Sequence, residues 1–164
     1  MEDQFKLYYT YNSDEDDSAY EFKTENAILY RVAFIIDNGM FPKISETEDN
    51  YIYHLVIEKL TEVHEPFDNK VGNTISLVIE EFFKNRKNSL IYFCNNSDDR
   101  GHVRAAKFER WYNNSNYKEY VYKESIKLDF EDSSLYTGYL IHKENPYYYE
   151  LLDLYRNLGE EASK

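Results

Sequence analysis

Apolar and polar side chains alternate in four short runs through the first third of the chain, which is the pattern of half-buried strands. The runs are residues 5–11, 19–24, 27–36 and 51–60. An acidic loop, "NSDEDDSA", separates the first two runs, and a polar loop with Gly39 and Pro42 precedes the fourth. Because short connections favour pairing between neighbours in the chain, we predict a four-stranded antiparallel meander.

The middle third contains one helical pattern and one continuous apolar run. Asp68 is a good N-cap residue, and the apolar residues after it recur at the spacing of a single helix face. These residues are Val71, Ile75, Val78, Ile79, Phe82 and Phe83. Residues 90–94, "LIYFC", are apolar without alternation, as in a strand that is covered on both faces. We therefore predict a helix followed by the central strand of the sheet.

The last third is expected to form a helix, a hairpin and a second helix. The first helix begins between Ser97 and Asp99 and ends near Tyr112. Residues 117–130 alternate between apolar and polar side chains, and an acidic turn joins them to a second run, 135–143. The apolar side of the first run consists of Tyr120, Tyr122, Ile126, Leu128 and Phe130. These two runs predict an antiparallel hairpin.

The final helix carries signals at both ends. Asn145 caps it, Pro146 occupies its first position, and Gly159 is expected to end it. Its inner stripe is Tyr147, Leu151, Leu154 and Leu158. The predicted order ββββ-α-β-α-ββ-α indicates an α+β fold, with three helices on a largely antiparallel sheet and residues 1–164 forming a single domain.

Charge narrows the classes of partner. The formal net charge of −12 over 164 residues opposes general attraction to nucleic acid and to anionic membranes, and it suits a basic partner better. The simpler alternative is that acidity only keeps an aromatic-rich chain soluble. The 18 tyrosines also allow two interpretations, an interaction surface or ordinary strand residues, because tyrosine is frequent both at protein interfaces and in strands.

Compartment and redox state follow from what the sequence lacks. It has no run of about 18 apolar residues and no basic start followed by an apolar stretch, so we expect a cytoplasmic protein that does not cross a membrane. The single cysteine, Cys94, cannot form an intramolecular disulfide. It ends an apolar run, which favours a core residue over a nucleophile.

The predicted helix that follows Asp99 gathers basic and aromatic residues on one side. At about 100° per residue, its basic side chains and its tryptophan share an arc of roughly 120°, with a phenylalanine at the edge. The residues concerned are Arg100, Arg104, Lys107, Phe108, Arg110 and Trp111. This arrangement suits an anionic or planar ligand. It equally suits a structural role, in which carboxylates pair with the arginines and arginine stems cover the rings.

Two aspartates stand where the central strand ends, a common place for functional side chains. Asp98 and Asp99 could serve as a metal ligand or a base, and capping of the following helix explains them equally well. The four histidines show no metal-ligand spacing, and no phosphate-binding or nucleophile motif is present. The sequence thus indicates no catalytic residues, no metal site and no cofactor.

Four segments together resemble a family of small bacterial proteins, DUF6169, which is a domain family of unknown function. They are "YEFKTENAILYRVAF", "NTISLVIEEFF", "LIYFCNNSDDRGHVRAAKFERWY" and "ENPYYYELLDLYRN". The most specific part of the resemblance is the spacing of Cys94, Asp98 or Asp99, Arg100, Arg104, Phe108 and Trp111. The family usually has a glycine directly before the first arginine, whereas here Gly101 follows Arg100. The resemblance extends over nearly the whole chain and implies one domain in a bacterial cytoplasm, with no implied activity.

Two functions remain open. The leading hypothesis is a non-enzymatic protein-binding module, such as an accessory, antitoxin-like or immunity-like protein. Its charge favours a basic partner, and homo-oligomers are an alternative. The alternative is a sensor or enzyme that holds a nucleotide or phosphate on the Arg/Trp helix face, with Asp98 or Asp99 as metal ligand or base. Nucleic-acid binding is disfavoured, because a local basic stripe would have to overcome the net negative field.

Overall fold

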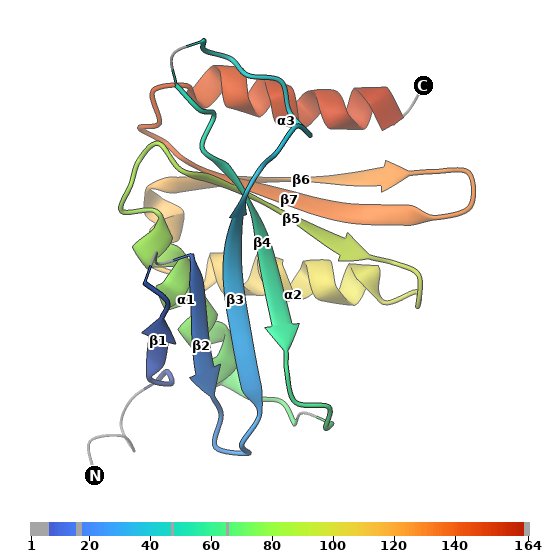
Figure 1. Cartoon of the computed structure of the whole chain (residues 1–164). Helices are drawn as coiled ribbons and strands as arrows, with labels where there is room; N and C mark the ends of the chain where they lie inside the picture. Colours follow the sequence, from blue (N-terminus) through green and yellow to red (C-terminus); the bar gives the residue numbers. More distant parts are fainter. Residues whose placement is uncertain (1–6, 16–17, 47, 65, 163–164) are drawn as a thin grey trace.

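Seven strands form one sheet and three helices pack on it in the part of the chain that the structure describes (Figure 1). This structure is a computed structural model, which describes residues 7–15, 18–46, 48–64 and 66–162. The strands are β1 (Tyr11–Ser13), β2 (Ala19–Lys23), β3 (Leu29–Ile36), β4 (Ile52–Lys59), β5 (Ser89–Asn95), β6 (Val121–Asp129) and β7 (Ser134–His142). The helices are α1 (Asn69–Phe82), α2 (Gly101–Asn113) and α3 (Tyr148–Ala162).

The sheet order β1-β2-β3-β4-β5-β7-β6 confirms the predicted meander, hairpin and α+β fold. All neighbouring strands are antiparallel except β4 and β5, because α1 carries the chain back across the sheet between them. The pairing of β4 with β5 is short and extends only from Ile52–Ser89 to His54–Ile91. Beyond these residues the two strands diverge (Figure 1).

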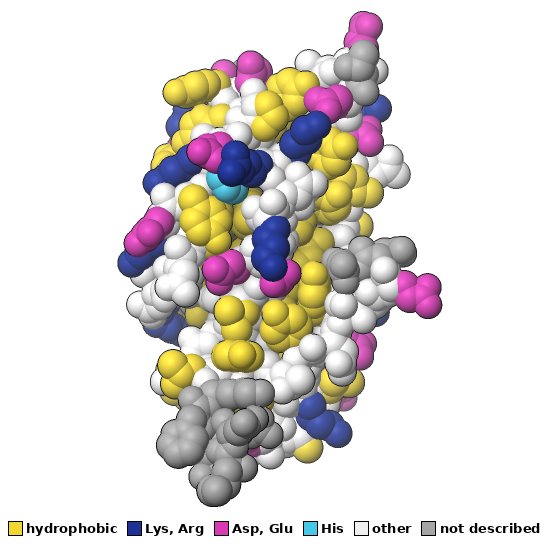
Figure 2. Space-filling view, turned by 90° about the vertical axis from the view of Figure 1, so that its left-hand side faces the viewer, with side chains coloured by type: hydrophobic (Ala, Val, Ile, Leu, Met, Phe, Trp, Pro, Cys, Tyr) yellow, Lys and Arg dark blue, Asp and Glu magenta, His cyan; other side chains and the backbone are white. Residues whose placement is uncertain are grey.

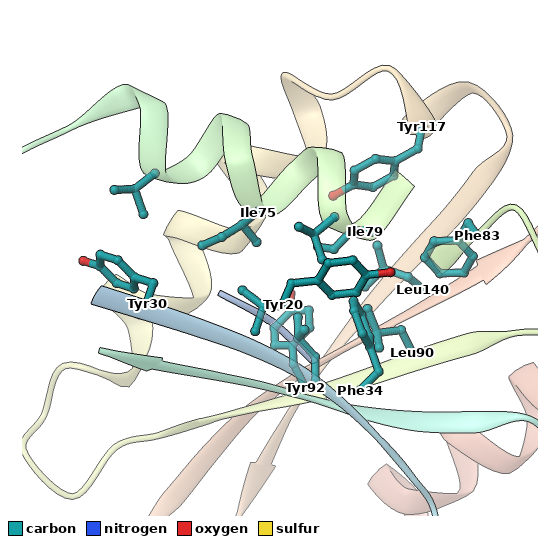
Figure 3. Packing of buried hydrophobic residues seen from close by; sticks show 14 of the residues in the cluster. Tyr20, Tyr30, Phe34, Ile75, Ile79, Phe83, Leu90, Tyr92, Tyr117 and Leu140 are labelled. Atoms are coloured by element: carbon teal, nitrogen blue, oxygen red, sulfur yellow. The ribbon is translucent and has the colours of Figure 1, made fainter. Parts of the chain in front are cut away.

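Two cores lie on opposite faces of the sheet, and β5 contributes to both. Leu90, Tyr92 and Cys94 belong to the core under α1 and α2, whereas Ile91 belongs to the core under α3. Figure 3 shows Ile75 and Ile79 pointing from α1 toward the sheet in the first core. The prediction that residues 90–94 form a strand covered on both faces is therefore confirmed, whereas the central strand of the sheet is β4, with β5 next to it. Burial also raises the pKa of Cys94 to about 11, as expected for a core residue.

The first strand is shorter than predicted. The prediction of residues 5–11 is wrong for residues 7–10, which precede β1, while residues 5 and 6 lie outside the described part. Here the main chain bonds to α1 rather than to a strand, although the Tyr9 ring also stacks on Phe22 of β2. The Tyr9 amide donates to Thr74 Oγ1 at 2.8 Å, and the Tyr9 hydroxyl donates to Asp68. Aromatic alternation here reflects packing against a helix and not a strand ladder.

The run predicted as a strand from 117 to 130 is also shortened at both ends. Residues Tyr117–Glu119 form a 3-10 turn, and β6 begins at Val121. Tyr117 is buried in the core with α1 and α2, which draws the chain out of the sheet at this point. Phe130 lies past the end of β6 and is half exposed.

Helix α3 begins and ends later than its sequence signals indicate. Asn145 Oδ1 accepts from the Tyr147 amide at 2.8 Å, as a cap does, although the helix itself begins at Tyr148, beyond Pro146. The prediction that Gly159 ends the helix is wrong, because α3 continues to Ala162. A Cβ at Gly159 would lie 3.2 Å from Ile126 Cγ2 of β6, so the glycine permits close helix–sheet packing. Leu152 and Tyr155 join the predicted inner stripe in the core.

The surface has no strong separation of charge on the side that carries β1 and α1. Figure 2 shows acidic and basic side chains next to each other between hydrophobic areas on this face. Surface ion pairs such as Lys84–Glu81 at 2.7 Å and Arg86–Glu144 at 2.9 Å also bring opposite charges together. No described helix combines the length and the apolar composition that crossing a bilayer requires.

Candidate functional site

The turn between β5 and α2 positions the two predicted aspartates, and neither of them is the N-cap of α2. The helix begins at Gly101 rather than between Ser97 and Asp99, and the cap residue is Arg100. Arg100 makes no side-chain bond to the start of the helix. Asn96 does so instead, since its Oδ1 accepts from the Gly101 amide at 2.8 Å. A Cβ at Gly101 would lie 2.9 Å from this asparagine side chain, so the close turn needs glycine at that position.

Asp98 holds Arg104 instead of capping the helix. The Arg104 guanidinium donates to both carboxylate oxygens of Asp98, at 2.9 and 2.7 Å, and to the main-chain oxygen of Asn95 at 3.0 Å. These bonds hold the pKa of Asp98 well below its usual range. Arg104 is therefore engaged by its own turn, which is the structural role that the sequence left open for the arginines.

Asp99 occupies a backbone conformation that favours glycine. Its φ is 60°, in the left-handed region. The residue stands directly before Arg100, the position at which the resemblance described above leads us to expect glycine. We expect Asp99→Gly to raise the free energy of unfolding by about 0.5–1 kcal/mol, measured by chemical denaturation. Asp98→Gly is the control and should lower it, because Arg104 would lose its partner. A stabilising Asp98→Gly would contradict this account of the turn.

The two predicted aromatic residues of α2 pack inward. The Phe108 ring stacks on Tyr92 with centroids 3.9 Å apart, and Trp111 meets Phe108 edge-on at 5.2 Å. Trp111 also lies against α1, where a Cβ added to Gly72 would be 2.2 Å from its Nε1. The eight candidate residues therefore do not form one face. Six of them divide into a local ion pair, an aromatic contact with the core, and the residues that line a groove, while Asp99 and Arg100 belong to none of these groups.

The groove lies between α1 and α2 and has a volume of about 670 Å³. Lys107, Arg110 and Trp111 line it from α2. Much of its other apolar lining comes from β3, β4, the start of α1 and the turn before β6, and includes Tyr30, Ile57, Phe67, Val71, Ile75 and Tyr117. Neither Lys107 nor Arg110 forms an ion pair within the described residues, and both side chains are exposed. The groove thus combines apolar lining with two unpaired cations on α2, and the acidic residues Asp68 and Glu80 line it from the side of α1.

The model of a family of unknown function, DUF6169, matches residues 67–157, more than half of the chain. The chain belongs to this family. The match includes α1, β5, α2, β6 and β7, whereas β1 to β4 lie outside it, so it is shorter than the resemblance predicted from the sequence. Neither the curated proteins nor the solved structures contain a match. In this DUF6169 protein, the matched region supplies both helical walls of the groove, while Tyr30 and Ile57 of its lining come from the meander.

Sequence reasoning found three groove residues and missed the rest of the lining. Of the missed residues, Phe67 is the one that the sequence could best have identified as unusual. An apolar residue before an N-cap normally packs on the fourth helical residue. That fourth residue is Gly72, which offers no side chain, and Phe67 is 80% exposed at the groove. Tyr30 and Ile57 look like ordinary strand residues in the sequence. Only the fold of the DUF6169 chain brings them beside α2.

The N-terminus of α1 borders the groove, and a protein carboxylate occupies it. Asp68 accepts from the Lys70 amide at 2.9 Å and from the Tyr9 hydroxyl. Burial and this bond to Asp68 raise the pKa of Tyr9 to about 12. A phosphate at this helix end would meet a negative charge instead of free amides.

A second pair of charges lies on the other side of α2. The Lys123 side chain is only 3% exposed, where it pairs with Glu109 and donates to Ser125 Oγ at 2.6 Å. Its ammonium lies 5.8 Å from the centroid of the Tyr92 ring. The contacts of Lys123 with Glu109 and Tyr92 join β6 to α2 and to β5. Within the described residues, no three histidine, cysteine or acidic side chains are placed to hold a metal ion.

Proposed function

We propose that this DUF6169 protein is a non-enzymatic protein-binding module, whose groove takes an apolar segment of a partner that also carries a carboxylate. The observation behind the proposal is the groove itself, with an apolar floor and the unpaired cations Lys107 and Arg110. An apolar side chain of the partner fills the floor, and its carboxylate lies between the two cations. Tryptophan, tyrosine and arginine at such a position are typical of the residues that dominate binding energy.

The charge of the whole molecule constrains the partner further. A net charge of −12 repels an acidic protein at long range, so the partner as a whole is neutral or basic. The carboxylate that meets Lys107 and Arg110 is then a local feature of its binding segment. An apolar floor beside two cations favours partners whose segment carries the carboxylate. A segment without it would leave Lys107 and Arg110 without an opposite charge next to an apolar surface.

The nucleotide- or phosphate-binding alternative has less support. Arg104 is held by Asp98, and Asp68 occupies the N-terminus of α1. Lys107 and Arg110 would have to hold a phosphate without main-chain amides or a third cation. A thermal-shift panel of nucleotides, inorganic phosphate and Mg²⁺ separates the two functions, and we expect no compound in it to raise the melting temperature.

The test of the proposal is capture of the partner from the native host with tagged protein, followed by mass spectrometry. We expect Lys107→Glu/Arg110→Glu to lose a specific partner by about tenfold or more, since two attractive contacts become repulsive. Lys43→Glu/Lys127→Glu is the matched control, because it makes the same change in charge at two exposed lysines outside the groove. Equal capture by both variants and the wild type, with all proteins folded, would remove the groove as the binding site.

A further inference from the structure

Strand β4 continues past the end of its pairing with β5. It is in register with β3 along its full length, to Tyr30–Lys59. Its register with β5 ends at His54–Ile91. One edge of the last part of β4 therefore has no strand beside it, although β4 lies in the interior of the sheet order.

Two hydrogen bonds at the start of β4 show in which direction its main-chain groups point. The Asp37 amide donates to the Ile52 oxygen at 2.7 Å, so even-numbered residues of β4 bond toward β3. The Ser89 amide donates to the Tyr51 oxygen at 2.8 Å, so odd-numbered residues face β5. Ile57 and Lys59 are the odd-numbered residues past the pairing. Their N–H and C=O groups form the free edge of β4.

One acceptor on the facing edge of β5, the Asn95 oxygen, is taken by a side chain. Odd-numbered residues of β5 face β4, as the Ser89 bond shows, and they include Asn95. The Asn95 oxygen accepts from Arg104, which Asp98 holds in place. No described side chain bonds in the same way to the main chain of Ile57 or Lys59. The two edges thus differ at Asn95, whose oxygen is taken by Arg104, whereas no described side chain takes the corresponding groups of Ile57 and Lys59.

The free edge of β4 adjoins the groove, because Ile57 belongs to both. We infer that the partner segment binds as an extended peptide strand, which pairs with the main chain of Ile57 and Lys59 and directs its carboxylate to Lys107 and Arg110. This inference rests on the proposed function and specifies the form of the partner. An extended peptide offers donors and acceptors at strand spacing, whereas a helical segment uses its own main-chain groups internally.

Hydrogen exchange of the protein without a partner tests whether the edge of β4 at Ile57 and Lys59 is free. Amides of Ile57 and Lys59 point away from β3, whereas those of Val56 and Glu58 belong to the β3–β4 ladder. We expect the first pair to exchange at least about 100-fold faster than the second in an NMR measurement at neutral pH. Equal protection of all four amides would overturn the inference, because the edge would then be closed.

Binding is tested with a peptide selected from a display library of random twelve-residue sequences. Selection uses the wild-type protein, with counter-selection on Lys107→Glu/Arg110→Glu, and fluorescence polarisation gives the affinity of the synthetic peptide. Lys59→Pro removes one N–H of the free edge and leaves the β3 ladder intact, so the variant should fold. We expect it to bind the peptide about tenfold more weakly than Lys59→Ala, which lacks the same side chain and keeps the N–H.

The outcomes separate this inference from the proposed function. A peptide that needs Lys107 and Arg110 but binds both Lys59 variants equally would refute strand pairing and leave the groove as the binding site. If Lys59→Pro does not fold, the peptide should still slow exchange of the Ile57 and Lys59 amides in the wild type by at least about tenfold, and unchanged exchange would refute pairing. Failure to select any discriminating peptide would also overturn the inference, while capture from the host decides the proposed function independently.

Discussion

Gly138→Ala is expected to lower the free energy of unfolding by about 3 kcal/mol or more, a large part of the stability of a domain of this size. Gly138 of β7 is paired with Tyr92 of β5. A Cβ at this position would lie 2.1 Å from Tyr92 Cζ and 2.2 Å from its hydroxyl oxygen. Tyr92 cannot swing away, because it is 2% exposed and its ring is stacked on Phe108. Chemical denaturation followed by circular dichroism measures the loss.

Double substitutions identify the cause of this loss. Tyr92→Phe removes the hydroxyl but keeps Cζ within 2.1 Å of the added Cβ, so Gly138→Ala should remain severe in that background. Tyr92→Ala removes the ring and costs about 3–5 kcal/mol by itself, yet Gly138→Ala should then add little. Equal effects of Gly138→Ala in all three backgrounds would show that backbone conformation, and not the ring, requires glycine at this position.

The sequence predicted most elements of the fold because local patterns and burial agree in them. Alternation located the meander and the hairpin, and the apolar run of residues 90–94 identified a strand covered on both faces. Asp68 was correctly expected to cap α1. Element ends were less predictable, because tertiary contacts decided them. Tyr117 left its strand for the core beside α1, and Gly159 remained helical because α3 packs closely on Ile126.

The candidate site could be predicted only in part. A helical projection of α2 gives the directions of its side chains but not what lies beside them. Arg104 shares an arc with Lys107 and Arg110, yet Asp98 in the preceding turn engages it and leaves the other two unpaired. The groove also needs residues from the meander, and the short β4–β5 pairing that leaves an edge free has no signal in the sequence. Parallel strands are paired through a crossover, so their register depends on the packing of α1.

Gly72→Ala is expected to destabilise the protein and to change the groove. Alanine is the better helix former by about 1 kcal/mol, so an exposed glycine in α1 would gain stability from the substitution. Here the added Cβ would lie 2.2 Å from Trp111 Nε1 and 2.6 Å from its Cδ1, so the indole must move away from α1. We expect the free energy of unfolding to fall by about 1–3 kcal/mol in spite of the gain in helix propensity. Chemical denaturation measures this change.

Fluorescence reports the displaced ring directly, because Trp111 is the only tryptophan of the chain. We expect a red-shifted emission in Gly72→Ala, as the indole leaves its contact with α1 for the groove. Gly159→Ala is the matched control. It adds the same methyl group to a helix, but its nearest neighbour is Ile126 at 3.2 Å, so stability should change little and the emission should stay the same.

The sign of the effect should reverse when the ring is absent. In a Trp111→Leu background, Gly72→Ala no longer meets the indole, and the helix propensity of alanine should make it stabilising by about 1 kcal/mol. A destabilising Gly72→Ala in that background would mean that another neighbour requires the glycine. Because the same indole lines the groove, Gly72→Ala should also weaken capture of the partner at concentrations where the variant is folded. The close approach of α1 and α2 at Gly72 therefore links the stability of the fold to the shape of its proposed binding site.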